Sequence, residues 1–249
     1  SEMCIRDSFS GGLLNSLAWE PGLSGLDIQP RLTALERLAK AGVQTASVQP
    51  AHFAGTGLTE AGLRGGRFVG VTDERALERR VEQIVDAALA GPRSFVYAYE
   101  RALDHEGHGH GWRSAQWTAV LAWADAFAAR LRAELPDDIR LIVTADHGMV
   151  DVPLHARVDL AREPGLLAGV RHVGGEARSV QLYCRRGAAR FVAAAWRVRL
   201  GPSASVLRRD EPLPWRPGWP SGWPAGASKA TSSAGTRGGP TVVAGWSGC

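Results

Sequence analysis

The chain has 249 residues, of which 45% are hydrophobic and 22% are charged, so its composition is that of a globular protein and excludes a disordered one. The formal net charge is +4, but a C-terminal stretch that lacks acidic residues after Glu211 contributes three of the positive charges. The rest of the chain is close to neutral, which argues against nucleic acid or an anionic membrane as a partner.

Membrane insertion is not indicated by the sequence either. The most apolar run, residues 120–131, is interrupted by Asp125 and Arg130 and is shorter than the roughly 18 residues that a span requires. We recognise no signal peptide, and three scattered cysteines do not predict a disulfide framework. Scarce cysteine is typical of a reducing compartment, so the sequence slightly favours the cytoplasm while leaving the localisation unassigned.

Strands and helices are predicted to alternate after a Gly-rich N-terminal loop. Hydrophobic periodicity and capping residues predict helices at residues 30–42, 73–90, 114–135 and 188–200, and strands at 43–48, 67–71, 94–99, 141–144 and 178–184. Residues 50–67 and 151–169 are predicted to be loops. This alternation is typical of an α/β fold whose largely parallel sheet is covered by helices on both faces.

Both ends of the chain differ from this body. Residues 1–8 show no periodicity and are interpreted as an artefactual or scar segment, whereas residues 9–200 are expected to form the folded domain. Residues 201–249 contain seven of the 14 prolines and four of the nine tryptophans, with the periodicity of neither a strand nor a helix. We expect this Pro/Trp/Gly-rich tail to be disordered and interpret it as the product of a shifted reading frame, which sequencing of the gene would test.

Two short stretches concentrate acidic and histidine side chains. Residues 103–111 read Leu-Asp-His-Glu-Gly-His-Gly-His-Gly, and because each glycine costs about 1 kcal/mol inside a helix we predict a loop there. In residues 141–149, an apolar strand is predicted to end at Asp146 and His147. Neighbouring strand residues point to opposite faces, and Gly148 permits the turn by which both could reach one ion. Taken alone, this stretch favours a functional site over the alternative, an ordinary strand end with a solvated aspartate.

Together, the two stretches have the composition of a metal centre. Aspartate oxygen and histidine nitrogen are ligands that zinc accepts, and the spacing of Asp104 and His108 allows both to bind one ion. Asp146 and His147 could bind a second ion. Two ions roughly 4 Å apart stabilise the attacking and leaving oxygens of an in-line displacement at phosphorus, so phosphoryl transfer is the predicted reaction class. The chain lacks a glycine-rich phosphate loop, which argues against an ATP-driven motor.

The Asp-His-Glu-Gly-His motif at residues 104–108 and the Thr-Ala-Asp-His-Gly-Met motif at residues 144–149 resemble paired metal motifs of a known family. This family is the nucleotide pyrophosphatase/phosphodiesterase family of the alkaline phosphatase superfamily, and residues 9–200 are similar to its bacterial members. The resemblance implies a partial catalytic domain with an alkaline phosphatase-like α/β fold that is incomplete at both ends.

The resemblance also implies which residues act. It assigns Asp104 and His108 to one zinc ion, and Asp146 and His147 to the other. In the family, a Thr or Ser attacks phosphorus to form a covalent intermediate, which a metal-activated water then hydrolyses. The expected substrates are small phosphorylated molecules such as nucleotides, nucleotide pyrophosphates and phosphodiesters. The alternatives are a phosphomonoesterase or phosphonate hydrolase of the same superfamily, and a non-catalytic fragment or pseudoenzyme.

The chain departs from the family's pattern at both ends. The family's first metal-binding Asp and its nucleophile lie upstream of anything that resembles Phe9, and its last metal-binding His lies downstream, in a context that the tail lacks. We therefore expect a fragment that carries four metal ligands but no nucleophile, and we expect these 249 residues by themselves to be catalytically inactive. Two tightly held zinc ions per chain, or phosphodiesterase activity that depends on a Thr within residues 56–72, would contradict this expectation.

Four other residues near these motifs or further along the chain are candidates for supporting roles. Arg171 and His172 are predicted to line the substrate cleft, where Arg171 would bind an anionic phosphate. His110 is an alternative ligand to His108, although its glycine neighbours favour an ordinary loop position. Glu106 is expected to face solvent, or to accept a hydrogen bond behind a metal ligand.

Overall fold

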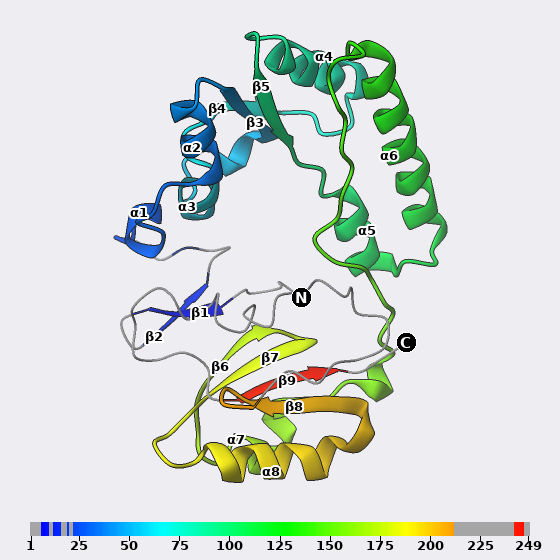
Figure 1. Ribbon diagram of the computed structural model, residues 1–249. Coiled ribbons are helices and arrows are strands. Elements are labelled where there is room, and N and C mark those ends of the chain that lie inside the picture. The colour runs from blue at the N-terminus through cyan, green and yellow to red at the C-terminus, as the bar shows by residue number, and fades with distance from the viewer. Residues whose placement is uncertain (1–5, 10–11, 16–18, 20–21, 212–241, 247–249) are drawn as a thin grey trace. The chain divides into compact units, whose positions relative to one another are not determined.

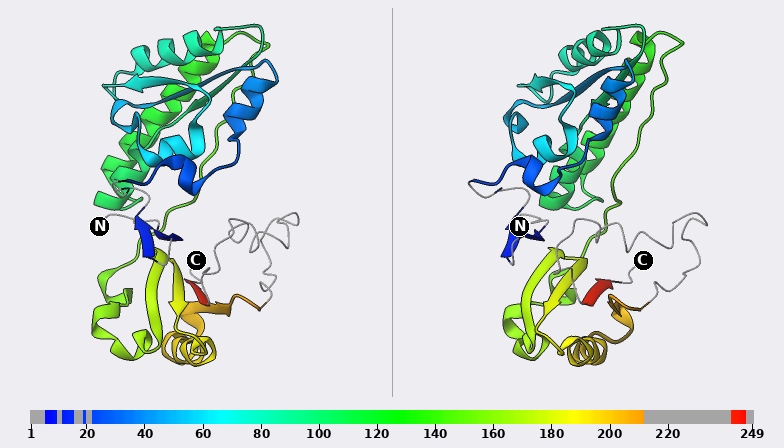
Figure 2. Two further views of the ribbon diagram at one scale, coloured as in Figure 1. Left: turned by 90° about the vertical axis from the view of Figure 1, so that its left-hand side faces the viewer. Right: turned by 60° about the vertical axis from the view of Figure 1, so that its left-hand side comes forward.

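The chain divides into two compact units, each with its own sheet and its own helices (Figures 1 and 2). Residues 21–156 form the parallel-sheet unit, and residues 1–20 together with 157–249 form the antiparallel-sheet unit. The structure is a computed structural model, and it describes residues 6–9, 12–15, 19, 22–211 and 242–246.

The parallel-sheet unit contains the three strands that the sequence predicts before residue 100. Its strands are β3 (Gln44–Pro50), β4 (Arg67–Val71) and β5 (Ser94–Ala98); its helices are α1 (Gly25–Ile28), α2 (Ala34–Lys40), α3 (Gly57–Leu63), α4 (Leu77–Ala88), α5 (Ala102–His110) and α6 (Ala115–Glu134); and its 3-10 turns are η1 (Ala51–Phe53) and η2 (Leu154–Ala156). Strand β3 lies between β4 and β5 and is parallel to both, with Val48 opposite Val69 and Ala98. The predicted parallel sheet is therefore confirmed.

Alternate side chains of β3 meet helices on opposite faces of this sheet. Ala46 and Val48 are buried in a cluster that includes Ile84 of α4 and Phe127 of α6. Ser47 points to the other face and lines a small cavity together with residues of α3 such as Thr59. Figure 1 shows α2 and α3 on one side of the strands and α4 and α6 on the other, so helices cover both faces, as the sequence predicts.

Two predictions about the first helices need correction. Helix α2 begins after Thr33 and not at Pro30, because Thr33 forms a capping box: its hydroxyl accepts from Glu36 N at 3.0 Å, and Glu36 accepts from Thr33 N at 2.7 Å. Helix α3 lies within residues 50–67, which were predicted as loop. The Thr56 hydroxyl caps this short helix, and tertiary packing outweighs its two glycines.

Helix α5 replaces the loop predicted for residues 103–111, so that prediction is wrong. The intrinsic cost of glycine is offset there by close packing. A Cβ on Gly107 would overlap the Met149 sulfur and would lie 3.4 Å from Trp117, so the absence of a side chain lets the helix approach both residues. The Glu106–His110 pair, one turn apart with nitrogen and oxygen 3.1 Å from each other, also connects successive turns.

No strand forms at residues 141–144, so this prediction is also wrong. Ile142 and Val143 are each 75% exposed and belong to no ladder. β-branched residues favour a strand only where a neighbouring strand completes it, and in the described part of the chain β5 pairs with β3 alone. The segment is instead anchored through Leu141, which packs on the core, and through Met149 against α5.

The antiparallel-sheet unit has a four-stranded sheet in the order β6-β7-β9-β8 and a separate hairpin, β1-β2. Its elements are β1 (Arg6–Phe9), β2 (Gly12–Asn15), η3 (Leu160–Arg162), α7 (Pro164–Leu167), β6 (Val170–Glu176), β7 (Ser179–Cys184), α8 (Ala189–Leu200), η4 (Gly201–Ser203), β8 (Ala204–Arg208) and β9 (Val242–Trp246). The predicted strand 178–184 and helix 188–200 are confirmed. The Trp196 indole of α8 donates to the Leu166 carbonyl at 2.7 Å inside this unit's core.

Strand β6 was not predicted, because Gly174 and Gly175 weaken its strand pattern; its pairing with β7 supplies the missing stabilisation. Strand β1 overlaps the segment interpreted as a scar and extends to Phe9, and β8 and β9 lie within the segment interpreted as a tail. Residues 212–241 of that tail lie outside the described residues. Among the described residues, no helix has the length and apolar character needed to cross a membrane.

Candidate metal centre

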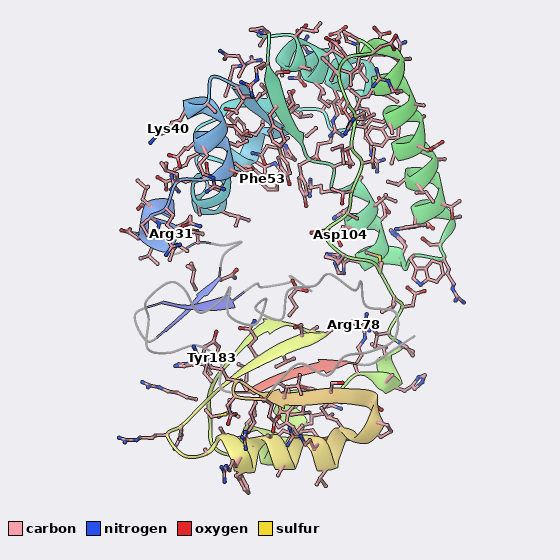
Figure 3. The ribbon with its side chains drawn as sticks, in the orientation of Figure 1. Arg31, Lys40, Phe53, Asp104, Arg178 and Tyr183 are labelled. Carbon is pink, nitrogen blue, oxygen red and sulfur yellow. The ribbon has the colours of Figure 1, made fainter. Side chains whose placement is uncertain are left out.

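Asp104 and His108 lie one turn apart on α5, with Asp104 Oδ1 3.3 Å from His108 Nε2. Figure 3 shows Asp104 projecting from the side of α5 that faces away from α6. Both side chains are partly exposed, but the Oδ1 atom itself is buried and accepts no hydrogen bond from any described residue. A buried carboxylate oxygen without a donor is unfavourable, and a cation bound between it and the imidazole would compensate it.

Asp146 and His147 lie in the extended segment that follows α6. Asp146 Oδ1 accepts a hydrogen bond from the backbone N–H of His147 at 3.1 Å, and its Oδ2 lies 3.8 Å from His147 Nε2. His147 Nδ1 is 3.0 Å from the Gly148 carbonyl oxygen, which favours the tautomer in which Nδ1 donates and Nε2 carries the lone pair. These two neighbouring side chains therefore lie close together, but not at the end of a strand, and their role as ligands stays a prediction.

The candidate acids affect the titration of two tyrosines. Burial raises the pKa of Tyr97 on β5 above its ordinary value, and the negative charge of Asp146 raises it further. The pKa of Tyr99, just after β5, is raised by the same two causes and also by Asp104. The charges of both acids therefore act on Tyr99, which directly follows β5.

The four candidate ligands form two pairs and do not form one complete coordination shell. Among the residues that the structure describes, no three His, Cys, Asp or Glu side chains come together as a metal-binding group. Each pair nevertheless offers one carboxylate oxygen and one imidazole nitrogen, a donor set that zinc accepts. The residues present therefore fit metal ions in pairs, with further ligands needed to complete each shell.

The turn between β5 and α5 carries ion pairs that the sequence interpretation missed. Arg101 donates to the Glu74 carboxylate over 2.8 to 3.2 Å, and these hydrogen bonds hold the pKa of Glu74 below its ordinary value. The buried Arg80 forms an ion pair with Glu100. A signal for Arg80 is visible in the sequence, because it lies three residues after Leu77 within the apolar stripe of α4, where arginine is rare.

The other predicted site residues have different surroundings. His110 Nδ1 lies 3.1 Å from Glu106 Oε2, so these two residues pair with each other and not with the first candidate pair. Arg171 and His172 lie on β6 in the antiparallel-sheet unit. Arg171 is exposed, whereas the Nε2 atom of His172 is buried without a hydrogen-bond partner among the described residues. Their role in binding substrate remains a prediction.

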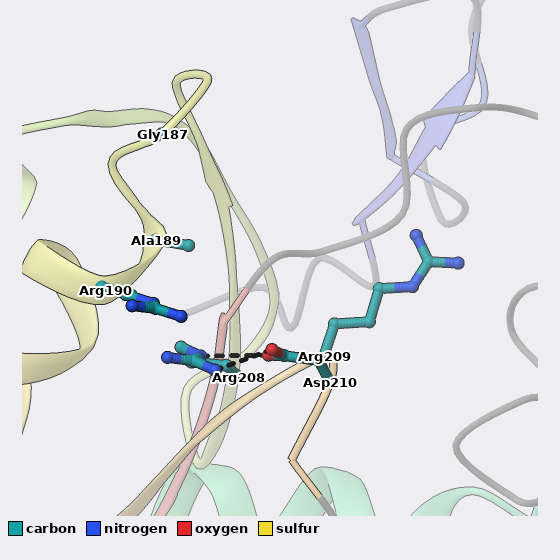
Figure 4. A pocket seen from close by; sticks show the side chains of 6 residues that line it. All are labelled: Gly187, Ala189, Arg190, Arg208, Arg209 and Asp210. Carbon is teal, nitrogen blue, oxygen red and sulfur yellow. Dashed lines mark hydrogen bonds and ion pairs between the residues drawn. The ribbon is translucent and has the colours of Figure 1, made fainter.

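A cavity of about 580 Å³ in the antiparallel-sheet unit contains none of the candidate metal ligands. It is lined by Gly187, Ala189, Arg190, Arg208, Arg209 and Asp210 (Figure 4). Arg208 donates to both carboxylate oxygens of Asp210, at 3.0 and 2.6 Å, and Figure 4 shows Arg209 pointing away from this pair. With three arginines and one aspartate the lining has a net positive charge, and the cavity does not resemble the acid–histidine pairs of the metal centre.

Comparisons with known proteins agree with the motifs. The model of the family described as type I phosphodiesterase/nucleotide pyrophosphatase matches residues 24–219. No curated protein sequence matches the chain.

Two solved structures of murine ectonucleotide pyrophosphatase/phosphodiesterase 5 are similar to the chain, one of them an inactive variant in complex with AMP. The TM-scores are 0.56 for that complex and 0.55 for the other structure, with 17% sequence identity in both cases. Each match covers 85% of this chain and 52% of the murine chain, so the chain spans about half the length of the solved structures that it matches. At this identity the likeness shows the fold, which is the α/β fold of the alkaline phosphatase type.

Proposed function

The chain belongs to the type I phosphodiesterase/nucleotide pyrophosphatase family, a family of phosphohydrolases that generally depend on divalent metal ions, and we propose that its gene product hydrolyses phosphodiester or nucleotide pyrophosphate bonds. The observation that carries this proposal within the chain is the buried Oδ1 atom of Asp104. It accepts no hydrogen bond from a described residue and lies 3.3 Å from His108 Nε2, as expected of a pair that shares a cation.

We assign two divalent ions to the centre, and the donor chemistry favours zinc. Asp104 and His108 would hold one ion, and Asp146 and His147 the other. Bound there, the ions would polarise the phosphoryl oxygens and make a water nucleophilic at neutral pH. The contribution of the chain itself is geometric: the helical spacing aligns the first pair, and the hydrogen bond from His147 Nδ1 to Gly148 orients the second imidazole.

A small phosphorylated molecule such as a nucleotide is the proposed substrate, and the murine structure in complex with AMP supports this choice. Arg171 and His172 are the proposed contacts to its anionic phosphate. We assign no nucleophile to this chain and propose that the 249 residues alone are inactive. A phosphomonoesterase or phosphonate hydrolase is the alternative within the superfamily, and a non-catalytic module is the alternative outside catalysis.

The product of the complete gene, supplied with zinc, should be assayed with a nitrophenyl phosphodiester, a nitrophenyl phosphomonoester and a nucleotide pyrophosphate. We expect hydrolysis of the diester and the pyrophosphate to exceed that of the monoester. His108→Ala should lower kcat/KM by at least about 100-fold, because losing a ligand costs more than losing its supporting hydrogen bonds. His110→Ala is the matched control on the same helix and should retain activity within about threefold. Equal effects of the two variants would overturn the ligand assignment, and a preference for the monoester would overturn the substrate assignment.

A further inference from the structure

Arg80 is a buried arginine whose hydrogen bonds lead to the start of α5. Its side chain is 2% exposed and forms an ion pair with Glu100, which lies between β5 and α5. The guanidinium also donates to two backbone carbonyls, those of Glu74 at 3.1 Å and Tyr99 at 3.0 Å. One side chain on α4 therefore holds the chain at the point where it leaves β5.

Aromatic rings fix the position of this guanidinium. Its central carbon lies 5.6 Å from the centroid of the Trp123 ring and 4.7 Å from that of Phe127, both on α6. Taking a charge pair out of water is costly, and replacing such a pair by apolar residues is often neutral or even stabilising. The Arg80–Glu100 pair is therefore weak evidence for stability, and a role in fixing local geometry accounts better for its burial.

The other oxygen of Glu100 extends this contact into α5. Glu100 Oε1 accepts a hydrogen bond from the Ala102 N–H at 2.6 Å, and this N–H belongs to the first turn of the helix, where no helical partner exists. The negative charge of Glu100 also lies at the positive end of the helix dipole. Asp104 is two residues further on in the same turn, so its position depends on how this turn begins.

We propose that the Arg80–Glu100 ion pair is a positioning device that sets the start of α5 and thereby holds Asp104 and His108 in the geometry of a metal-binding pair. This inference rests on the proposed function, in which these two residues are ligands. Within the part of the chain that the structure describes, Arg80 forms no hydrogen bond or ion pair with Asp104 or His108; it acts through Glu100 and the first turn of the helix.

A matched control is available in the same unit. Arg64 has a side chain that is 14% exposed; it forms an ion pair with Glu36 of α2 at 3.3 Å and donates to the carbonyls of Glu60 and Ala61 of α3. It is an inward-facing arginine with the same kinds of partner, but it connects α2 to α3 and not to α5. Arg64→Met therefore removes a comparable ion pair without touching the candidate ligands.

The first test measures amide hydrogen exchange in the full chain without metal. Arg80→Met should speed exchange in α5 by about tenfold or more relative to α2, and Arg64→Met should show the reverse. Arg80→Lys keeps the positive charge but loses the forked geometry of the guanidinium, so its exchange rate in α5 should lie between those of the unsubstituted chain and of Arg80→Met. The Lys variant replaces the Met variant if the latter does not fold. Equal acceleration of α2 and α5 by the Arg80 variants would show a merely structural role and overturn the proposal.

The second test titrates Co²⁺ into the same variants and follows its visible absorption. The Arg80 variants should weaken Co²⁺ binding by about tenfold, the lower end of what supporting contacts contribute to metal sites, whereas Arg64→Met should leave it unchanged. Unchanged affinity in the Arg80 variants would contradict the proposal. If the unsubstituted chain gives no Co²⁺ spectrum, the titration is repeated on the complete gene product, where a missing spectrum would overturn the assignment of the metal pair. The exchange measurement decides independently whether Arg80 positions α5.

Discussion

Asp146 lies close enough to Tyr99 for its negative charge to raise the pKa of the phenol, and Asp104 contributes in the same direction. The two acids come from different elements, one from helix α5 and one from a segment outside any helix or strand. Both charges therefore act on a group at the C-terminal end of β5, and in α/β proteins ligands usually bind at this edge of a parallel sheet.

The tyrosine titration tests this relationship. Asp146→Asn should lower the pKa of Tyr97 and Tyr99, but not fully to the ordinary value of 10, because burial is the larger cause and remains. Ultraviolet absorbance of tyrosinate during an alkaline titration provides the measurement. Asp125→Asn, an exposed change on α6, is the control and should leave the titration unchanged. If Asp146→Asn also leaves it unchanged, Asp146 does not lie near these phenols.

The same tyrosines predict a dependence of stability on pH. Their pKa is raised in the folded state, so the unfolded chain releases these protons first as the pH rises. The associated stability is fully present below about pH 10 and is lost as the pH rises through the folded-state pKa. Replacing both tyrosines by Phe should therefore make the urea midpoint fall less steeply between pH 9 and pH 11. An identical slope in the substituted and unsubstituted chains would contradict the raised values.

Glycines 107 and 109 of α5 should respond oppositely to substitution by alanine. Gly107→Ala would place a methyl group onto the Met149 sulfur, and we expect a loss of about 1–3 kcal/mol from overpacking. Gly109→Ala meets nothing within 4 Å and should gain up to about 1 kcal/mol from helix propensity. Urea unfolding measures both changes. Combining Gly107→Ala with Met149→Ala should recover part of the loss, and a double variant no better than the sum of its parts would rule out this contact.

The Glu74–Arg101 pair predicts a second pH effect, at the acidic end. Hydrogen bonds from Arg101 lower the folded-state pKa of Glu74, so the stability that they contribute is present above its ordinary pKa of 4.5 and is lost as the pH falls through the lower folded value. Because the pair is partly exposed, we expect a contribution of at most about 1 kcal/mol. Glu74→Gln should therefore cost stability at pH 7 and little below pH 3. A cost that is the same at both pH values would be inconsistent with this ion pair.

The local pattern of apolar and polar residues was sufficient to predict most strands and helices of the parallel-sheet unit. Strands β3, β4 and β5 and helices α4 and α6 have clear periodicity, and α6 begins after Ser114, where the sequence predicts its start. The predicted start of α4 at residue 73 is four residues too early, because the helix begins at Leu77 without a side-chain cap. The two motifs also led to the family, because they combine rare residue types at fixed spacing. These features depend on residues close together in the chain, which the sequence displays directly.

The start of α2 is an error about a local signal, the capping box of Thr33 and Glu36, whereas the larger errors concern segments whose structure depends on distant residues. Helix α5 looked like a loop because the contacts that compensate Gly107, from Met149 and Trp117, come from elsewhere in the chain. The strand expected at residues 141–144 has the right composition, but it has no partner strand in the described residues. The Arg80–Glu100 pair likewise joins elements that no local pattern connects.

The positions of zinc ions in crystals of the complete gene product, located by anomalous scattering, test the central claim most directly. We predict two ions roughly 4 Å apart, one bound by Asp104 and His108 and the other by Asp146 and His147. A single ion shared by all four residues, or zinc bound only by other side chains, would contradict the two-metal centre proposed for this chain.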